Sequence, residues 1–249
     1  MNNILQKIVA DLRPEVEQKK RDMPLDEYDF PIRPTFRAAF PGIIAELKKA
    51  SPSKGIIREN FDVISLALEL EQAGAAALSV LTEPNYFKGD INYLQIISKT
   101  VVIPLLRKDF IFDRYQILEA RHAGASAVLL IASMLPHKEL ISLGEYALSI
   151  GLDVLGEAHN EEEVNRLLDS PATLIGVNAR DLATFETDLK RVETLLKLIP
   201  PERFPIAESA IKDSSDVLRL QEAGAKGFLI GEALMRSNSP GDKLKELLQ

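Results

Sequence analysis

In the segment PLLRKDF at residues 104–110, a short apolar run is followed by three consecutive charged residues, Arg107, Lys108 and Asp109. Phe110 and a further apolar pair follow directly, so a solvated loop would account for the charges but not for the Phe-Ile-Phe. An amine and a carboxylate at the end of a buried strand are groups suited to proton transfer. The segment therefore indicates a site at the mouth of a strand.

Similar groups stand at the ends of other short apolar runs. Glu46 and Lys48 are two residues apart, so a strand would point both side chains the same way. The segments LGEAH, GVNARDL and AESA add Glu157, Asn178, and Glu208 with Ser209. Two lysines with three glutamates fit either an acid–base site or a structural network of ion pairs, and the pattern alone leaves both open.

Two further segments indicate an anion site. SPSKG at residues 51–55 offers the hydroxyl of Ser51, and IGEALM at residues 230–235 places Gly231 and Glu232 at the start of an expected short helix. The unpaired backbone N–H groups of a helix start carry a partial positive charge that attracts phosphate. The two segments together favour a phosphate-bearing ligand.

An internal repeat indicates the scaffold that positions these groups. QAGAAALSVL, HAGASAVLLI and EAGAKGFLIG place Gly74, Gly124 and Gly224 at intervals of 50 and then 100 residues. Each glycine follows an amphipathic segment and precedes an apolar run, as expected for a left-handed helix cap before a strand that is buried on both faces. A degraded copy, DSPATLIGVN, begins at Asp169.

A period of 50 residues fits two strand–helix units, so the chain from about residue 43 onward predicts about eight such units. The predicted fold class is therefore α/β, a (βα)8 TIM barrel, which takes ~250 residues and places its chemistry at the carboxyl ends of the strands. An open doubly wound sheet is the alternative, and the repeat and the missing G-x-G-x-x-G argue against it. The expected strands are 42–47, 76–81, 101–106, 127–132, 152–158, 173–178, 204–209 and 227–231, and expected helices include 114–123, 137–150, 160–168, 188–198 and 214–223.

Residues 1–42 stand outside the repeat. We expect residues 1–249 to form a single barrel domain, with 1–42 as an N-terminal helical extension packed on the barrel. Residues 2–12 predict an amphipathic helix, and residues 13–20 predict the start of another, because proline is favoured in a first helical turn and Pro14 stands there.

Composition limits the partners. The net charge of -7 and the pI near 5.2 argue against nucleic acid or an anionic membrane as the main partner. The chain has no cysteine, which excludes disulfides and thiolate metal sites and fits a reducing cytoplasm, and its three histidines are too scattered to favour zinc. No apolar run approaches the ~20 residues of a spanning helix, and the amino terminus lacks the apolar region of a secretory signal. The expected localisation is cytoplasmic.

Seven motifs together resemble one family. IIAELKKASPSKG, LTEPNYFKG, LLRKDFIFDRYQILEAR, EAHNEEE, GVNARDLATF, AESAI and LIGEALM are similar, in order and spacing, to motifs of indole-3-glycerol-phosphate synthase. The resemblance extends from about Phe36 onward and implies a carboxy-lyase of tryptophan biosynthesis. The implied reaction closes a ring in 1-(2-carboxyphenylamino)-1-deoxyribulose 5-phosphate with loss of carbon dioxide and water. It implies no metal or organic cofactor and an anionic sugar phosphate as the small-molecule partner; a monomer or a weak homo-oligomer is expected.

The resemblance also implies residue roles. Lys108 is expected to be the general acid and Glu157 to supply or remove the other proton, while Lys48, oriented by Glu46, holds the substrate carboxylate or acts as a second acid. A lysine suits such roles when its pKa falls toward working pH, which burial and the neighbouring cation would promote. The remaining expected contacts are Asn178 and Glu208 for hydroxyls and developing charge, Phe87, Phe110 and Leu182 for the anthranilate ring, with plain core as their alternative, and Ser51, Arg180, Ser209, Ala210, Gly231 and Glu232. Arg107 and Asp109 are expected to brace the loop, and Arg180 to pair with phosphate or with an acidic neighbour.

Three residues depart from the family's usual motifs at the expected ligand end. Ala210 stands where glycine is usual, Ala179 where asparagine or serine is frequent, and Ala233 where serine is usual. If the backbone at residue 210 needs positive φ, alanine costs on the order of 1–3 kcal/mol there. We therefore expect retained activity with weaker phosphate binding. Two other functions remain open on the same barrel, namely a Schiff-base aldolase that uses Lys108 or Lys48, and a non-catalytic phosphate-binding barrel.

Overall fold

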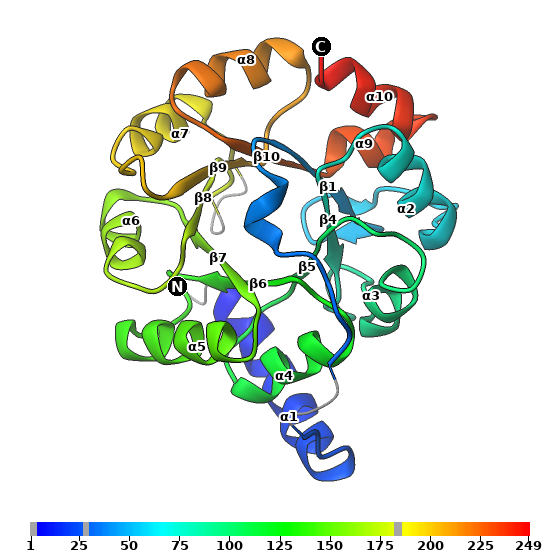
Figure 1. The fold of residues 1–249 in the computed structure, drawn as a ribbon, viewed down its shortest axis with the longest axis vertical. Coiled ribbons are helices and arrows are strands. Elements are labelled where there is room, and N and C mark those ends of the chain that lie inside the picture. Colours follow the sequence, from blue (N-terminus) through cyan, green and yellow to red (C-terminus); the bar gives the residue numbers. More distant parts are fainter. Residues whose placement is uncertain (1–3, 27–29, 182–185) are drawn as a thin grey trace.

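The computed structural model describes residues 4–26, 30–181 and 186–249 and shows eight parallel strands closed into a barrel inside a ring of helices (Figure 1). The barrel strands neighbour one another in the order β1, β4, β5, β6, β7, β8, β9, β10, and β10 pairs with β1. Their bounds are Gly42–Leu47, Ala77–Leu81, Leu105–Lys108, Ala127–Ile131, Asp153–Ala158, Leu174–Asn178, Phe204–Glu208 and Gly227–Ile230. A small antiparallel hairpin of β2, Ala50–Ser51, and β3, Gly55–Ile56, follows β1. The predicted TIM barrel is confirmed.

The helices alternate with the barrel strands, as the repeat predicts. They are α2 Val63–Gln72, α3 Ile91–Ile97, α4 Arg114–His122, α5 His137–Ser149, α6 Glu161–Leu168, α7 Leu189–Leu196, α8 Ser214–Glu222, α9 Glu232–Arg236 and α10 Pro240–Leu247. Six of them begin after an aspartate or asparagine whose side chain accepts backbone N–H bonds of the first turn, namely Asp62, Asp90, Asp113, Asn160, Asp188 and Asp213.

The three repeat glycines end helices as expected. Gly74, Gly124 and Gly224 have φ of 99°, 85° and 110°. In each copy the glycine N–H and the next N–H bond back to the last helical turn, as in Gly74 to Glu71 and Ala75 to Leu70. Glycine reaches this left-handed conformation without the steric cost of a Cβ, so each helix stops at the same point and turns into the next strand.

Two apolar cores stabilise the barrel. One lies between the strands and the surrounding helices, and the other fills the barrel interior with side chains such as Ile44, Leu106, Leu155, Leu174 and Ile206. Because side chains alternate along a strand, the positions two residues toward the carboxyl end from this interior layer also face inward. The side chains at these positions therefore reach the mouth of the barrel at the carboxyl ends of its strands.

One strand differs from its prediction. The third strand is β5 at Leu105–Lys108, rather than residues 101–106. Pro104 has no N–H for a ladder, and the N–H groups of Val102 and Ile103 bond instead to the carboxylate of Glu71. The strand therefore starts after the proline and extends to the charged residues.

The N-terminal extension also differs from its prediction. A single helix, α1 at Ile4–Asp22, replaces the two expected helices and contains Pro14. Leu5, Ile8, Leu12 and Val16 form one buried stripe across the proline, so packing holds the helix through a residue that usually breaks it.

The extension reaches both ends of the barrel. The apolar side of α1 packs in one cluster with Phe110, beyond the carboxyl end of β5, and Tyr86 donates to Asp11. A short 3-10 helix, η1 at Phe36–Ala39, lies at the opposite end, where Phe36 is fully buried in the barrel interior. The N–H of Arg37 bonds there to Asp153, the first residue of β7.

Candidate active site

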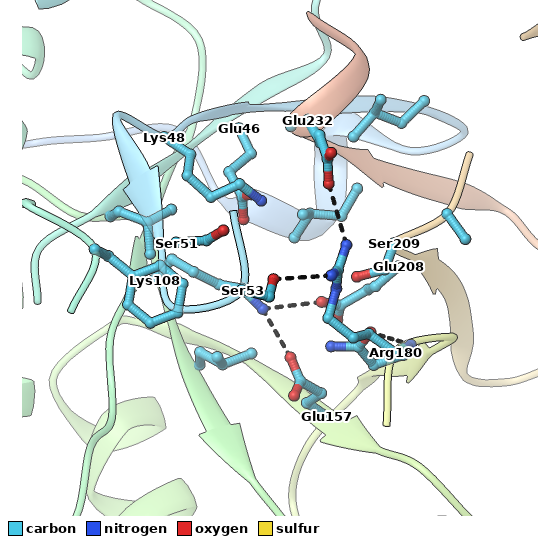
Figure 2. A pocket seen from close by; sticks show the side chains of 18 of the residues that line it. Glu46, Lys48, Ser51, Ser53, Lys108, Glu157, Arg180, Glu208, Ser209 and Glu232 are labelled. Carbon is cyan, nitrogen blue, oxygen red and sulfur yellow. Dashed lines mark hydrogen bonds and ion pairs between the residues drawn. The ribbon is translucent and has the colours of Figure 1, made fainter. Parts of the chain in front are cut away.

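The carboxyl ends of four alternate barrel strands bring ionisable groups into one cavity. Lys48 follows β1, Lys108 ends β5, Glu157 lies in β7 and Glu208 ends β9, and all four line the same pocket (Figure 2). The strands between them contribute Leu81, Ile131, Asn178 and Gly231 to its wall. Around the ring of strands, positions with a charged side chain therefore alternate with uncharged positions. They lie at the same level because every second side chain of each strand faces the barrel interior.

Lys108 is the centre of this layer. Its Nζ donates to Glu157 Oε2 at 2.7 Å and to Glu208 Oε2 at 2.9 Å. Glu157 and Glu208 are only 2% and 1% exposed, so the ammonium group neutralises carboxyls that water does not reach. The structural ion-pair network left open above is thus present, and it forms part of the wall of the cavity.

Their titration is coupled through this contact. Burial raises the pKa of Glu208 to about 7, with the charge of Glu157 adding to burial and Lys108 opposing it. Burial acts the same way on Glu157, but Lys108 and His159 outweigh it and lower the pKa of Glu157 to about 2. Glu208 therefore keeps its proton to a higher pH than Glu157 does, a separation that suits acid and base roles.

The expected fall in the lysine pKa is not found for Lys108. Burial alone would lower the pKa of Lys108, but the charges of Glu157, Glu208 and Glu46 outweigh it and raise it. The neighbouring cation does not oppose them, because Arg107 faces the other side of the strand. Its guanidinium bonds to Asp109 at 2.9 Å and 3.2 Å and to the Gln116 carbonyl at 2.6 Å. Arg107 and Asp109 brace the loop, as expected.

A second amine and an aromatic wall lie beside this cluster. Lys48 Nζ donates to Glu46 Oε1, and Glu46 is buried. The rings of Phe87 and Phe110 lie 5.9 Å apart, tilted by 43°, and both line the cavity. The loop that carries Phe87 is fixed by the fully buried carboxylate of Glu83, which accepts the N–H groups of Asn85, Tyr86 and Phe87.

The opposite part of the cavity is formed by loops. Ser51, Ser209, Ala210, Gly231 and Glu232 line it, together with Arg180 and Ser53. Ser209 and Ala210 have φ of 68° and 62°, so the alanine that replaces the usual glycine does occupy the left-handed region.

Arg180 pairs with an acidic neighbour. Its guanidinium contacts Glu232 at 3.2 Å and the Ser53 hydroxyl at 3.3 Å, across the mouth (Figure 2). The helix that begins at Glu232 has five residues, so its dipole is small, and Arg180 is the stronger anion partner.

The structure gathers nearly all of the predicted site residues around one cavity. All those that the structure describes line it, and Leu182 lies outside the described residues. One expectation is wrong: among the three departures only Ala210 lines the cavity, whereas the fully buried Ala179 and the partly buried Ala233 do not. Sequence reasoning missed Ser53 and the apolar wall of Leu81, Leu129, Ile131 and Leu229, although inward strand periodicity could have identified the wall.

Metal clusters and membrane-spanning helices are both absent from the described ranges. Among residues 4–26, 30–181 and 186–249, no group of three or more His, Cys, Asp or Glu side chains is arranged to hold a metal ion. Within the same ranges, no helix has the length and apolar character needed to cross a membrane.

The fold and the site define a class of protein, a (βα)8 barrel whose carboxyl mouth carries two lysines among buried carboxyls and an arginine at its rim. The family described as "Indole-3-glycerol phosphate synthase" matches residues 5–247. The chain belongs to that family.

Relatives agree with this assignment. A protein of Aliarcobacter butzleri named indole-3-glycerol phosphate synthase is 53% identical over 202 residues, which cover 81% of this chain and 77% of the relative. One of the same name from Alkaliphilus metalliredigens is 44% identical across 98% of this chain and 97% of the relative. Solved structures of similar fold include 3-hexulose-6-phosphate synthase from Salmonella typhimurium, with TM-score 0.68 and 15% identity over 83% of this chain and 96% of that chain. At that identity the likeness concerns the fold alone.

Proposed function

We propose that the protein is a carboxy-lyase that converts 1-(2-carboxyphenylamino)-1-deoxyribulose 5-phosphate to indole-3-glycerol phosphate, with loss of carbon dioxide and water, in tryptophan biosynthesis. Family membership and the names of the relatives support the reaction. The observation that carries the proposal is Lys108 held between two buried carboxyls beside an aromatic wall, with a second lysine and an anion-receptive rim in the same cavity.

Lys108 is the proposed general acid. Its raised pKa keeps the group an ammonium, because Glu157, Glu208 and Glu46 outweigh the effect of burial. The ammonium donates a proton to the substrate carbonyl oxygen as the aromatic carbon attacks, and carbon dioxide then leaves.

Glu157 is the proposed base for the dehydration that follows. With a pKa of about 2 it is ionised near neutral pH, because Lys108 and His159 outweigh its burial. It accepts the carbon-bound proton that must leave when the double bond of the new ring forms, and Lys108 donates the proton with which the departing hydroxyl leaves as water. It lies 2.7 Å from Lys108 Nζ, so one proton can be returned to the acid without crossing solvent.

The remaining cavity residues bind and orient. Lys48 pairs with the substrate carboxylate, Glu46 directs its ammonium, and Phe87 and Phe110 hold the anthranilate ring. Ser51, Ser209, Ala210 and Gly231 surround the phosphate, and Asn178 and Glu208 bind the hydroxyls of the sugar chain. Arg180 exchanges its Glu232 partner for the phosphate, since a phosphate accepts more hydrogen bonds from a guanidinium than this single 3.2 Å contact provides.

The Schiff-base alternative is disfavoured by charge. A Schiff-base lysine must present a neutral amine with a free lone pair, whereas the three carboxyls around Lys108 stabilise its ammonium form. Borohydride treatment with a keto-sugar phosphate distinguishes the two chemistries, because only the aldolase is trapped as a covalent adduct.

The test is a fluorescence assay for product formation from the anthranilate substrate. We expect turnover by the wild-type protein and by Lys99→Ala, a substitution of an exposed lysine outside the cavity. Binding of substrate without any indole-type product would favour the non-catalytic barrel and end this proposal.

A further inference from the structure

We propose that Glu83 is a positioning residue for the aromatic ring of the substrate, because it holds Phe87 in place through backbone N–H groups. The proposal rests on the proposed function, since that reaction brings an aromatic ring to the wall formed by Phe87 and Phe110. Glu83 follows the end of β4 by two residues and does not line the cavity, whereas both phenylalanines do. It is nevertheless fully buried, which is unusual for a loop carboxylate that has no part in the chemistry.

The carboxylate of Glu83 accepts three consecutive backbone N–H groups. Oε1 accepts from Asn85 at 2.9 Å, and Oε2 accepts from Tyr86 at 2.7 Å and from Phe87 at 2.9 Å. Within residues 4–26, 30–181 and 186–249, no lysine, arginine or histidine side chain pairs with it. Burial raises the pKa of Glu83, and the three N–H bonds oppose that rise. Any shift of the loop would leave a buried carboxylate without its donors, which is costly, so the charge and the loop conformation stabilise each other.

The backbone of this loop is closed at both ends. The N–H of Gly89 donates to the Glu83 carbonyl at 2.8 Å, and Lys88 between them has a φ of 55°. A Cβ at Gly89 would lie 2.4 Å from the Leu81 carbonyl oxygen, so the loop returns directly onto the end of β4. The side chain of Glu83 binds the segment between these two ends, which is the segment that carries Phe87.

A second buried carboxylate holds the other ring of the wall. Asp109 Oδ1 accepts the N–H of Phe110 at 2.8 Å, and Asp109 Oδ2 accepts the hydroxyl of Thr82. The N–H of Thr82 donates to the Lys108 carbonyl at 3.1 Å. Thr82 directly precedes Glu83, so the two loops that carry the rings are bonded to each other where they leave their strands. The 5.9 Å separation of the rings and their 43° tilt are therefore set by bonds to two neighbouring carboxylates as well as by packing.

Side chains of the same loop also reach α1. Asn85 donates to Glu15 at 3.0 Å, and Tyr86 donates to Asp11 at 2.5 Å. Both contacts are exposed to water, which competes for the same groups, so each contributes less than a buried bond to a carboxylate. Glu83 is therefore the main anchor of the loop.

Glutamine cannot replace this carboxylate. It has nearly the same size, but it carries one oxygen acceptor and one NH2 donor. If its oxygen accepts from Tyr86 and Phe87, its NH2 faces the N–H of Asn85, and the opposite orientation sets the NH2 against the other two N–H groups. Either orientation brings donors together and displaces the loop. The cavity then loses its contact with the aromatic ring of a ligand but keeps its contacts with a sugar phosphate.

The first test compares a ligand that has the ring with one that lacks it. The first ligand is the proposed substrate with its carbonyl reduced to an alcohol, which cannot close the indole ring, and its affinity is measured by anthranilate fluorescence. The second is ribitol 5-phosphate, measured by displacement of the first. We expect Glu83→Gln to weaken the first ligand by on the order of 10-fold and to leave the second unchanged, because one buried bond and one aromatic contact are lost. Glu145→Gln, at an exposed position of α5 outside the cavity, should change neither.

Two outcomes of this comparison refute the proposal. Equal weakening of both ligands would show that Glu83 supports the whole cavity and not the ring wall, and unchanged affinity for the ring ligand would show that Phe87 does not depend on Glu83. If circular dichroism shows that the Glu83→Gln protein does not fold, Glu83→Asp takes its place. Aspartate keeps the charge but withdraws it from the N–H groups by one methylene, so the same ring-selective loss is expected and the same two outcomes refute it.

The second test is a double-mutant cycle with Phe87→Ala. Because Glu83 acts through Phe87, Glu83→Gln should weaken the ring ligand in the wild-type background and have no further effect in the Phe87→Ala background. Fully additive losses would mean that Glu83 acts by another route and would overturn the proposal. Both tests measure binding and not turnover. Wild-type protein that binds the ring ligand but forms no product refutes the proposed function, and the comparison still decides the role of Glu83; wild-type protein that binds neither ligand refutes both.

Discussion

Replacement of Glu208 by glutamine tests the charge state of the site directly. Glutamine copies the shape of a protonated carboxyl and keeps an oxygen for the Lys108 ammonium, which lies 2.9 Å from Glu208 Oε2. Burial raises the pKa of Glu208 from 4.5 to about 7. The protonated Glu208 side chain therefore contributes fully to the free energy of unfolding below about pH 4.5, and this contribution is lost as pH rises through about 7. The substitution should therefore help the fold more at alkaline pH than at acidic pH.

The expected size of this change in stability follows from the pKa shift of Glu208. A rise of about 2.5 pKa units, from 4.5 to about 7, corresponds to about 3 kcal/mol at 1.36 kcal/mol for each unit. This figure is an upper value, because Glu157 shares Lys108 and part of the shift belongs to the pair. The free energy of unfolding, from urea titrations of both proteins at pH 4.5 and pH 8, gives the comparison.

A control of opposite sign is available in α4. Burial would raise the pKa of Glu119, but Arg107 and Lys19 outweigh it and lower it, so its ionised form stabilises the fold above its unfolded value of 4.5. Glu119→Gln should therefore destabilise the protein more at pH 7 than at acidic pH. If the stability difference between Glu208→Gln and wild-type protein were equal at both pH values, Glu208 would be ionised in the fold and the assignment of the proton would be wrong.

Three further substitutions are informative. Lys108→Ala should lower kcat by about 10²-fold or more in the product-formation assay, and near-normal turnover would reassign the acid to Lys48. Ala210→Gly should stabilise the fold by about 1 kcal/mol in thermal or urea unfolding, because it removes a left-handed alanine, and should lower KM; an unchanged KM would show that residue 210 does not weaken phosphate binding. Gly176→Ala should lower kcat with little loss of helix content by circular dichroism, because the added methyl meets the Glu208 carboxyl; full activity would mean that the position of Glu208 is not critical.

Sequence periodicity predicted the fold because the same local feature, a glycine that caps a helix before a buried strand, is repeated along the chain. The helix caps at Gly74, Gly124 and Gly224 are local features, readable from a few residues each. The carboxyl ends of the predicted barrel strands likewise placed Lys108 and Glu157 at one rim. The start of β5 and the continuous helix α1 could not be read this way, because long-range contacts to Glu71 and to the barrel decide them.

The charges and pKa values of the site residues were harder to predict than which residues form the site. Two adjacent basic residues, Arg107 and Lys108, suggested a depressed lysine pKa, yet the two side chains leave the strand on opposite faces. The charges that control Lys108 come from Glu157 and Glu208, which lie 49 and 100 residues farther along the chain. Tertiary structure decides which charged groups lie next to Lys108. The sequence pattern identifies the charged residues of the site but does not give the distances between them.

The N-terminal extension has a consequence for the order in which the molecule is assembled. Lys19 and Lys20 of α1 bond to Glu119 and Asp113, about 100 residues downstream. Arg33 donates to the carbonyls of Ser98, Val101 and Ile103. During synthesis this segment emerges before any of these partners exist, so these contacts can form only after the chain through α4 has been translated. The first-made part of the chain therefore depends on later-made residues for its attachment to the barrel.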